Sequence, residues 1–101
     1  MIHYELEGTT LFIQLPEQFD HHNSINLVQD TDHLIKEYRL KNLVFDFTNT
    51  RFMDSSGIGI LLGRYKRMRT LCGKVFVYGT DERICRIMDM AGLSELILEW
   101  V

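Results

Sequence analysis

The sequence predicts a single α/β domain, residues 1–101, built on a mixed and mostly parallel sheet. Short apolar runs typical of strands alternate with longer segments in which apolar residues recur at helical spacing. Strand–helix–strand units need right-handed crossovers and imply parallel pairing, whereas two strand-like runs joined by a turn open the chain and add an antiparallel pair. We therefore expect about five strands with three or four helices packed against them.

The first half of the chain predicts a β-hairpin followed by an amphipathic helix. Residues 2–7 alternate between apolar and polar side chains, a Gly-Thr turn follows, and residues 11–15 form a second apolar run. A helix is expected over residues 24–38, with Asn23 or Ser24 as its N-cap. The positions that give it a helical stripe are Ile25, Leu27, Val28, Thr31, Leu34, Ile35 and Tyr38.

The second half predicts further strands separated by helices. Residues 43–47 and 74–78 are short runs rich in β-branched and aromatic side chains, and residues 96–100 close the chain as a last strand. Between the first two runs, a helix follows Asp54 and ends near Gly73. Its apolar stripe consists of Ile58, Leu61, Leu62, Tyr65 and Met68.

A third helix is expected between the last two strands. Thr80 or Asp81 serves as its N-cap, and Gly92 stands where a left-handed C-terminal cap is favoured. Its apolar side chains are Ile84, Ile87, Met88 and Ala91.

Composition narrows the classes of function. An apolar fraction of 46% with 25% charged residues is ordinary for a soluble globular protein. The sequence shows neither a secretory signal nor an apolar run of membrane length, so we expect a cytoplasmic protein with no membrane partner. The net charge of −3 gives no general affinity for nucleic acid, which favours a protein partner. Cys72 and Cys85 form no Cys-x-x-Cys motif, and we interpret both as small core residues.

The segment with chemical content is Phe52–Gly59, at the predicted junction between a strand and a helix. Backbone N–H groups and the helix dipole favour an anion there, so a hydroxyl at this place is well positioned to carry a phosphate. Gly57 and Gly59 lack side chains, which lets a second protein surface approach the backbone closely. Spacing alone also allows, and favours, a plainer interpretation in which Asp54 and Ser55 are only helix caps.

The order of residues in this segment adds a resemblance. Asp54-Ser55-Ser56-Gly57-Ile58-Gly59, with Phe52-Met53 before it and residues 61–66 after it, closely resembles the phosphorylation segment of bacterial STAS-domain anti-sigma factor antagonists, the sporulation type in particular. Asp20-His21-His22 resembles the acidic loop after the second strand of that family. Residues 86–93 resemble its hydrophobic helix that ends in a Gly-Leu step. The resemblance implies a STAS-like fold for the whole chain.

The resemblance also implies a cycle controlled by one serine. With the serine free, an antagonist of this family binds its cognate anti-sigma factor, an ATP-binding serine kinase, and so releases a sigma factor for transcription. The kinase phosphorylates the serine and the complex dissociates, after which a serine phosphatase resets the protein. By its place in the motif Ser55 is the acceptor, with Ser56 as second choice. ATP and Mg²⁺ are expected on the kinase, with no cofactor on this chain.

The same resemblance implies a partner-binding surface on a chain that is no enzyme and is monomeric when free. The residues expected there are Asp20, His21, His22, Asn23, Asp54, Ser56, Gly57, Ile58 and Gly59. Two departures retune the partner-facing loop. Residues 17–20 read Glu-Gln-Phe-Asp where relatives usually have Gly-Glu-Leu-Asp, and Asn23 stands where threonine is common. The chain also ends soon after the last expected strand, where many relatives add a helix.

Other chemical functions fit the residues less well. The side-chain types of a hydrolase triad occur in Asp20, His21, His22 and Ser55, but no Gly-x-Ser-x-Gly elbow exists, and adjacent loop histidines rarely orient one another. The four histidines show no metal-ligand spacing, so we expect solvated loop side chains and no metal site.

Positive charge gathers on the second predicted helix, at Arg64, Lys66, Arg67 and Arg69. The overall acidity and the lack of an aromatic platform argue against nucleic-acid binding. A solvated helix face, or a patch complementary to an acidic protein, is the favoured interpretation.

The main alternative function is a STAS module without a phosphorylation switch, which serves a larger assembly or a lipid or solute transport system. Transporter-linked versions are normally fused to membrane spans, and free-standing lipid-transport versions often keep a serine or threonine without a kinase. A neighbouring gene for an ATP-binding anti-sigma kinase, or for transporter components, discriminates between the two functions. The sequence does not identify the sigma factor.

Overall fold

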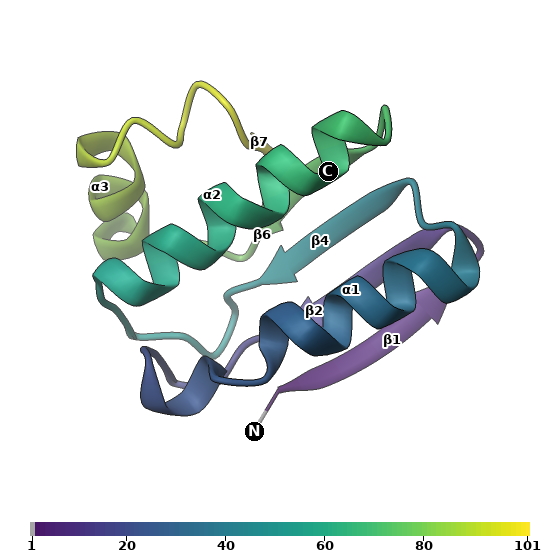
Figure 1. The fold of residues 1–101 in the computed structure, drawn as a ribbon. Helices are drawn as coiled ribbons and strands as arrows, with labels where there is room; N and C mark the ends of the chain where they lie inside the picture. Colours follow the sequence, from purple (N-terminus) through teal and green to yellow (C-terminus); the bar gives the residue numbers. More distant parts are fainter. Residues whose placement is uncertain (1) are drawn as a thin grey trace.

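The computed structural model describes residues 2–101 and has a mixed sheet at its centre (Figure 1). Within this range the sheet has five strands in the order β1-β2-β4-β6-β7. The first pair is antiparallel and the other neighbours are parallel, as the sequence predicts. The strands are β1 (His3–Glu7), β2 (Thr10–Gln14), β4 (Asn42–Asp46), β6 (Lys74–Tyr78) and β7 (Leu98–Glu99).

Two long helices cover one face of this sheet and a third lies toward the carboxyl ends of the strands (Figure 1). Their bounds are α1 (Leu27–Tyr38), α2 (Ser55–Thr70) and α3 (Glu82–Met90). The strand residues that face α1 and α2 alternate along β2, β4 and β6, as expected for a sheet with one covered face. None of the helices described between residues 2 and 101 is long and apolar enough to cross a membrane.

The core lies between the sheet and the helices. Strand side chains such as Ile13, Phe45 and Val77 pack there with Leu61 and Met68 of α2. Each of these five is at most 6% exposed, so the helical stripe predicted for the second helix does face the sheet. Burial of such side chains stabilises the fold by about 1.5–3 kcal/mol each before the entropy of ordering is subtracted.

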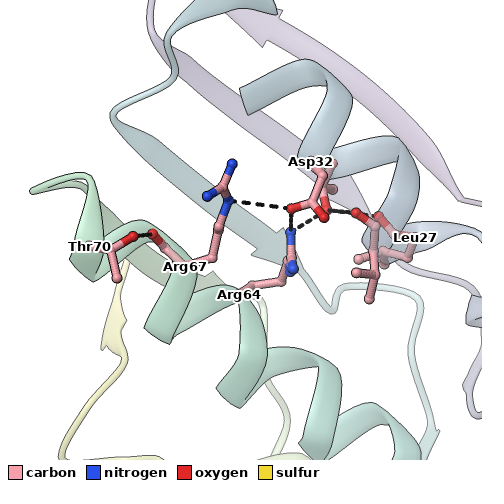
Figure 2. A network of polar contacts seen from close by, with 7 residues as sticks. Leu27, Asp32, Arg64, Arg67 and Thr70 are labelled. Atoms are coloured by element: carbon pink, nitrogen blue, oxygen red, sulfur yellow. Dashed lines mark hydrogen bonds and ion pairs between the residues drawn. The ribbon is translucent and has the colours of Figure 1, made fainter. Parts of the chain in front are cut away.

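An ion pair between a buried arginine and a half-exposed aspartate joins the two long helices (Figure 2). Arg64 of α2 is 6% exposed, and its guanidinium donates hydrogen bonds to Asp32 and to the Thr31 hydroxyl of α1, the latter at 3.2 Å. Arg67 lies beside the same carboxylate, with 3.6 Å between Nε and Oδ1. The prediction that Arg64 belongs to a solvated basic face is therefore wrong, because the spacing that places Leu61 and Met68 in the core also turns Arg64 inward.

The opposite face of the sheet carries an aromatic strip. Phe12 and Phe76 point away from the helices, and Trp100 meets both rings edge-on with centroid separations of 5.7 and 5.0 Å. The backbone N–H of Trp100 also bonds to the carbonyl of Val77 at 2.8 Å. The last strand is thus shorter than the predicted residues 96–100, because ladder pairing there is restricted to Leu98–Glu99 and this one further bond.

Two local predictions are wrong. Cys72 and Cys85 are both exposed, because Cys72 lies in the turn after α2 with φ of +59° and Cys85 lies on the outer side of α3. Neither Asn23 nor Ser24 caps α1, which begins only at Leu27 after the short 3₁₀ helix η1 (His22–Ser24). The third helix is capped by Asp81, which accepts from the Ile84 N–H at 2.8 Å.

Candidate functional site

A two-stranded parallel pair that the sequence did not reveal holds the candidate site together. Strands β3 (Gln18–Phe19) and β5 (Phe52–Met53) pair in register. The carbonyl of Glu17 accepts from the Arg51 and Phe52 N–H groups at 2.8 and 3.2 Å. Each strand has only two residues, which is too short for a periodic signal. The pairing places the predicted acidic loop directly beside the start of α2.

Asp54 is the N-cap of α2. Its backbone is extended, and its Oδ1 accepts from the Ser56 and Gly57 N–H groups at 2.9 and 3.2 Å. A carboxylate in this position satisfies donors that the first helical turn leaves free and is favoured by the helix dipole. The capping interpretation is thus correct for Asp54. It does not extend to Ser55, which is the first helical residue and is exposed.

The two glycines of the first turns of α2 face different surroundings. Gly57 is buried, and a Cβ at this position would lie 2.7 Å from the Phe19 carbonyl oxygen and 2.7 Å from Cγ of Met53. Gly59 is exposed, and no atom would lie within 4 Å of its Cβ. The missing side chain at Gly57 therefore makes room for the protein's own β3 strand, whereas the space around Gly59 is open.

The loop from Asp20 to Ser24 has a defined shape. The Asp20 carboxylate accepts a hydrogen bond from the Asn23 N–H at 2.9 Å. The backbone carbonyl of Asp20 accepts one from the buried Ser24 hydroxyl. The Asn23 side chain donates to the Gln18 carbonyl at 3.1 Å and so ties the loop back to β3. His21 and His22 are exposed. In the part of the chain that the structure describes, no three His, Cys, Asp or Glu side chains are grouped to hold a metal ion.

The predicted residues lie on two adjoining segments, and Gly57 is the one among them that is buried. Asp20, His21, His22 and Asn23 form the loop between β3 and α1, and the other predicted residues belong to the first turns of α2. Ser56 and Ile58 are half-buried there.

A shallow groove of about 440 Å³ continues this surface between α1 and α2. Sequence reasoning missed its apolar side chains, because Ile25 and Val28 were assigned to the core stripe of the first helix. They are 68% and 38% exposed. The helical stripe of residues 24–38 is wider than the face that the sheet can cover, which is the signal that could have indicated this groove. Its lining is His21, Ser24, Ile25, Val28, Ser56, Gly59, Ile60, Gly63 and Arg64.

Comparisons with known proteins identify the family of this chain. The family model described as "STAS domain" matches residues 2–101. The anti-sigma F factor antagonist of Paenibacillus polymyxa is 32% identical over 96 residues, which cover 95% of this chain and 82% of that protein.

Solved structures of the anti-sigma factor antagonist SpoIIAA have the same fold. The unphosphorylated form has a TM-score of 0.88 at 22% identity and covers all of this chain and 89% of its own. The phosphorylated form, described as a Bacillus cell fate determinant, has a TM-score of 0.81 at 22% identity and covers all of this chain and 92% of its own. The family match over residues 2–101 and the Paenibacillus relative together show that this chain belongs to the STAS domain family, among the anti-sigma factor antagonists.

Proposed function

We propose that this chain is an anti-sigma factor antagonist whose binding to an anti-sigma factor is controlled by phosphorylation of Ser55. Unmodified, it binds the anti-sigma factor, which is a serine kinase, and a sigma factor is released. Phosphorylated, it dissociates until a serine phosphatase restores the hydroxyl. The observation that carries the proposal is the exposed Ser55 at the first position of α2, directly after the Asp54 cap and beside the Asp20–Ser24 loop. The names of its relatives support the same role.

The position of Ser55 suits a hydroxyl that another protein must reach. It lies on the exposed side of the first turn, whereas Ser56 is half-buried and lines the groove toward α1. A kinase active site has to surround its acceptor hydroxyl, so the more exposed serine is the better substrate. This difference supports Ser55 over Ser56 as the acceptor.

Charge explains how one phosphate releases the partner. The group adds about −1.5 to −2 charges at pH 7. Asp54 already occupies the Ser56 and Gly57 N–H groups with its carboxylate, so the phosphate gains little from those donors and stands beside a like charge. A partner that packs against this surface has to desolvate both anions, which costs several kcal/mol when no cation compensates. Each 1.4 kcal/mol is about tenfold in affinity.

The chemistry of phosphoryl transfer belongs to the partner in this proposal. The sequence has no Gly-x-x-x-x-Gly-Lys-Ser/Thr loop to hold nucleotide phosphates. We therefore assign ATP and Mg²⁺ to the kinase and give this chain no catalytic residue, with Asp20, His21, His22, Asn23 and Ile58 as further partner contacts.

The test uses the purified chain, its cognate kinase and ATP. Intact-mass spectrometry is expected to show one added phosphate on the parent and on Ser56→Ala, and none on Ser55→Ala. Calorimetric titration with the kinase is expected to show tight binding for the parent and for Ser55→Ala, and binding weakened about a hundredfold for the phosphorylated protein. Modification of Ser55→Ala at the parental rate, or equal affinity of both forms, would rule the proposal out.

A further inference from the structure

The edge of the sheet opposite Ser55 carries a second hollow. The parallel strands β2, β4 and β6 all begin there, at Thr10, Asn42 and Lys74, whereas Ser55 follows strand β5 at the carboxyl edge. The hollow has a volume of about 500 Å³ and lies between the C-terminal turns of α1 and α2. It therefore shares no lining residue with the candidate site or with the groove beside it.

Apolar side chains form the floor of this hollow. Ile35 and Leu40 are buried at 2% and 4% exposure and belong to the core. Leu71, just after α2, is 49% exposed and stands at the side of the hollow. A large aliphatic side chain with half its surface in water contributes nothing to the packing on its exposed half. An incoming apolar group would cover it.

Cations surround the apolar floor. Lys36, Arg39, Lys41 and Arg67 are the charged residues that line the hollow, and no carboxylate lines it. Among residues 2–101, Lys36, Arg39 and Lys41 form no ion pair, whereas Arg67 lies 3.6 Å from Asp32.

The nearby acidic groups do not neutralise this rim. Asp32 is shared between Arg64 and Arg67, and Glu37 contacts His33. Three uncompensated cations thus gather at one place on a chain whose net charge is −3. Such a local reversal of sign attracts an anionic partner even though the whole molecule is acidic.

The backbone at Arg39 is consistent with a role for its side chain. Arg39 ends α1 in the left-handed region, with φ of +50°, and its N–H bonds to the Ile35 carbonyl. Glycine is the usual residue for this helix-ending geometry because a Cβ is unfavourable there. The chain keeps a long cationic side chain at this position on the rim.

We propose that this hollow docks an acidic segment of a partner protein, which seats its bulky apolar side chains on Leu40 and Leu71 and places carboxylates against Lys36, Arg39 and Lys41. An apolar centre with a rim that includes arginine is typical of protein-binding sites. Nucleic acid fits less well because no aromatic side chain lines the hollow for base stacking. A membrane fits less well because the apolar atoms form a recess, whereas insertion into a bilayer requires protruding apolar side chains.

Because the hollow lies at the opposite edge from Ser55, a partner here can stay bound in both states of the serine. The acidic segment would then tether the antagonist while the anti-sigma factor binds and leaves. The inference does not depend on the Ser55 switch, since it rests on residues of α1, α2 and the loops that follow them.

The test is a titration of ¹⁵N-labelled full chain with a short synthetic peptide rich in glutamate, with leucines at positions i and i+4 of a helix. Amide shifts are expected in residues 35–41 and 67–71 and not around Ser55. A peptide with serines in place of the leucines is expected to bind at least about tenfold more weakly. Equal binding of the two peptides, or shifts centred on other residues, would show that no apolar seat exists and would overturn the proposal.

Charge-reversed variants complete the test. Arg39→Glu with Lys41→Glu is expected to weaken peptide binding at least about tenfold. Arg83→Glu with Arg86→Glu makes the same change of charge on α3 and is expected to leave peptide binding unchanged. Leu71→Ser, at a position that is 49% exposed, is expected to weaken peptide binding because it removes apolar contact. If the two α3 substitutions weaken peptide binding equally, the effect comes from net charge alone, which would contradict a binding site at the hollow. Anionic vesicles or a DNA oligonucleotide that shift these amides where the peptide does not would contradict a protein partner.

Discussion

At the scale of single residues, Asp54 and Ser55 have separate tasks although they are adjacent. The Asp54 carboxylate accepts hydrogen bonds from the Ser56 and Gly57 N–H groups of the first turn, and Ser55 is left exposed at the first helical position. A serine that itself capped the helix would have its hydroxyl engaged by the backbone. The aspartate therefore keeps the serine accessible, and modification of Ser55 does not remove the cap.

The two glycines in the first turns of α2, Gly57 and Gly59, give a matched prediction on stability. Gly57→Ala is expected to lower the free energy of unfolding by about 1–3 kcal/mol, because the new Cβ would lie 2.7 Å from the Phe19 carbonyl oxygen. Gly59→Ala is expected to raise it by about 0.5–1 kcal/mol, because the site is open and alanine favours the helix. Urea unfolding of both variants measures the difference. Equal effects would contradict the close packing of Gly57 against β3.

Residue-level prediction from sequence succeeds where the cause is local. The Asp54 cap follows from a short polar residue just before a helical stripe, and the left-handed Gly92 after α3, with φ of +75°, follows from the same kind of signal. The packing of Gly57 against Phe19 was not predicted, because Phe19 lies far away in the sequence. Cys72 and Cys85 were assigned to the core because free cysteine is usually buried. Both are exposed here, because Cys72 lies at the end of a helix and Cys85 on an outer helix face.

At the scale of elements, the joint between α1 and α2 depends on one partly buried carboxylate. Asp32 is 44% exposed and contacts Arg64, whose side chain is only 8% exposed. The cost of removing one partner therefore depends on which of the two charges remains. A buried guanidinium without a counter-ion is much less favourable than a half-exposed carboxylate, which water can still solvate.

This difference in burial predicts how much three substitutions lower the free energy of unfolding relative to one another. Asp32→Ala is expected to lower the free energy of unfolding by about 3 kcal/mol, because Arg64 then stays buried and unpaired. Arg64→Met is expected to cost only about 1 kcal/mol, since an apolar chain replaces the charge. Arg67→Ala, at 41% exposure, serves as the control and is expected to cost less than about 1 kcal/mol. Denaturant unfolding of the three variants measures the order, and a cost for Arg64→Met above that for Asp32→Ala contradicts it.

The order of the main strands and helices could be predicted from the sequence, but the element that positions the site could not. Strands of five residues and helices with a stripe leave a periodic signal, and all of the long elements were expected. The β3–β5 pair has two residues a side and is specified by tertiary contacts alone. The burial of Arg64 was missed for a related reason, since its partner Asp32 lies on another helix.

At the scale of the whole molecule, the two ends of the sheet differ in chemical character. The carboxyl edge carries Asp54 and the Asp20–Ser24 loop, and the opposite edge carries the basic hollow. The strands β2, β4 and β6 and the helices α1 and α2 separate the two edges. A charge added at the exposed Ser55 would thus lie outside the core.

We expect phosphorylation of Ser55 to leave the fold intact. The phosphate lies on an exposed residue at a helix N-terminus, where the dipole favours it by about 0.3–1 kcal/mol and repulsion from Asp54 offsets part of that gain. Because about 1 kcal/mol shifts the melting temperature of a domain of this size by roughly 4–8 °C, the two forms should melt within that interval. Calorimetric scans of both forms measure this, with Ser55→Asp as a partial mimic. A collapse of the melting temperature would mean that the switch acts by unfolding.

The aromatic strip on the open face of the sheet gives the molecule a built-in optical probe. Trp100 is the only tryptophan in the sequence, and its ring lies edge-on between Phe12 and Phe76, on the side away from α1 and α2. Its emission should respond when the strands that hold these rings separate. A kinase or a phosphate at the start of α2 lies across the sheet from this fluorophore. We therefore expect the tryptophan emission of this chain to report unfolding and to change little on phosphorylation of Ser55, which fluorescence of the two purified forms measures.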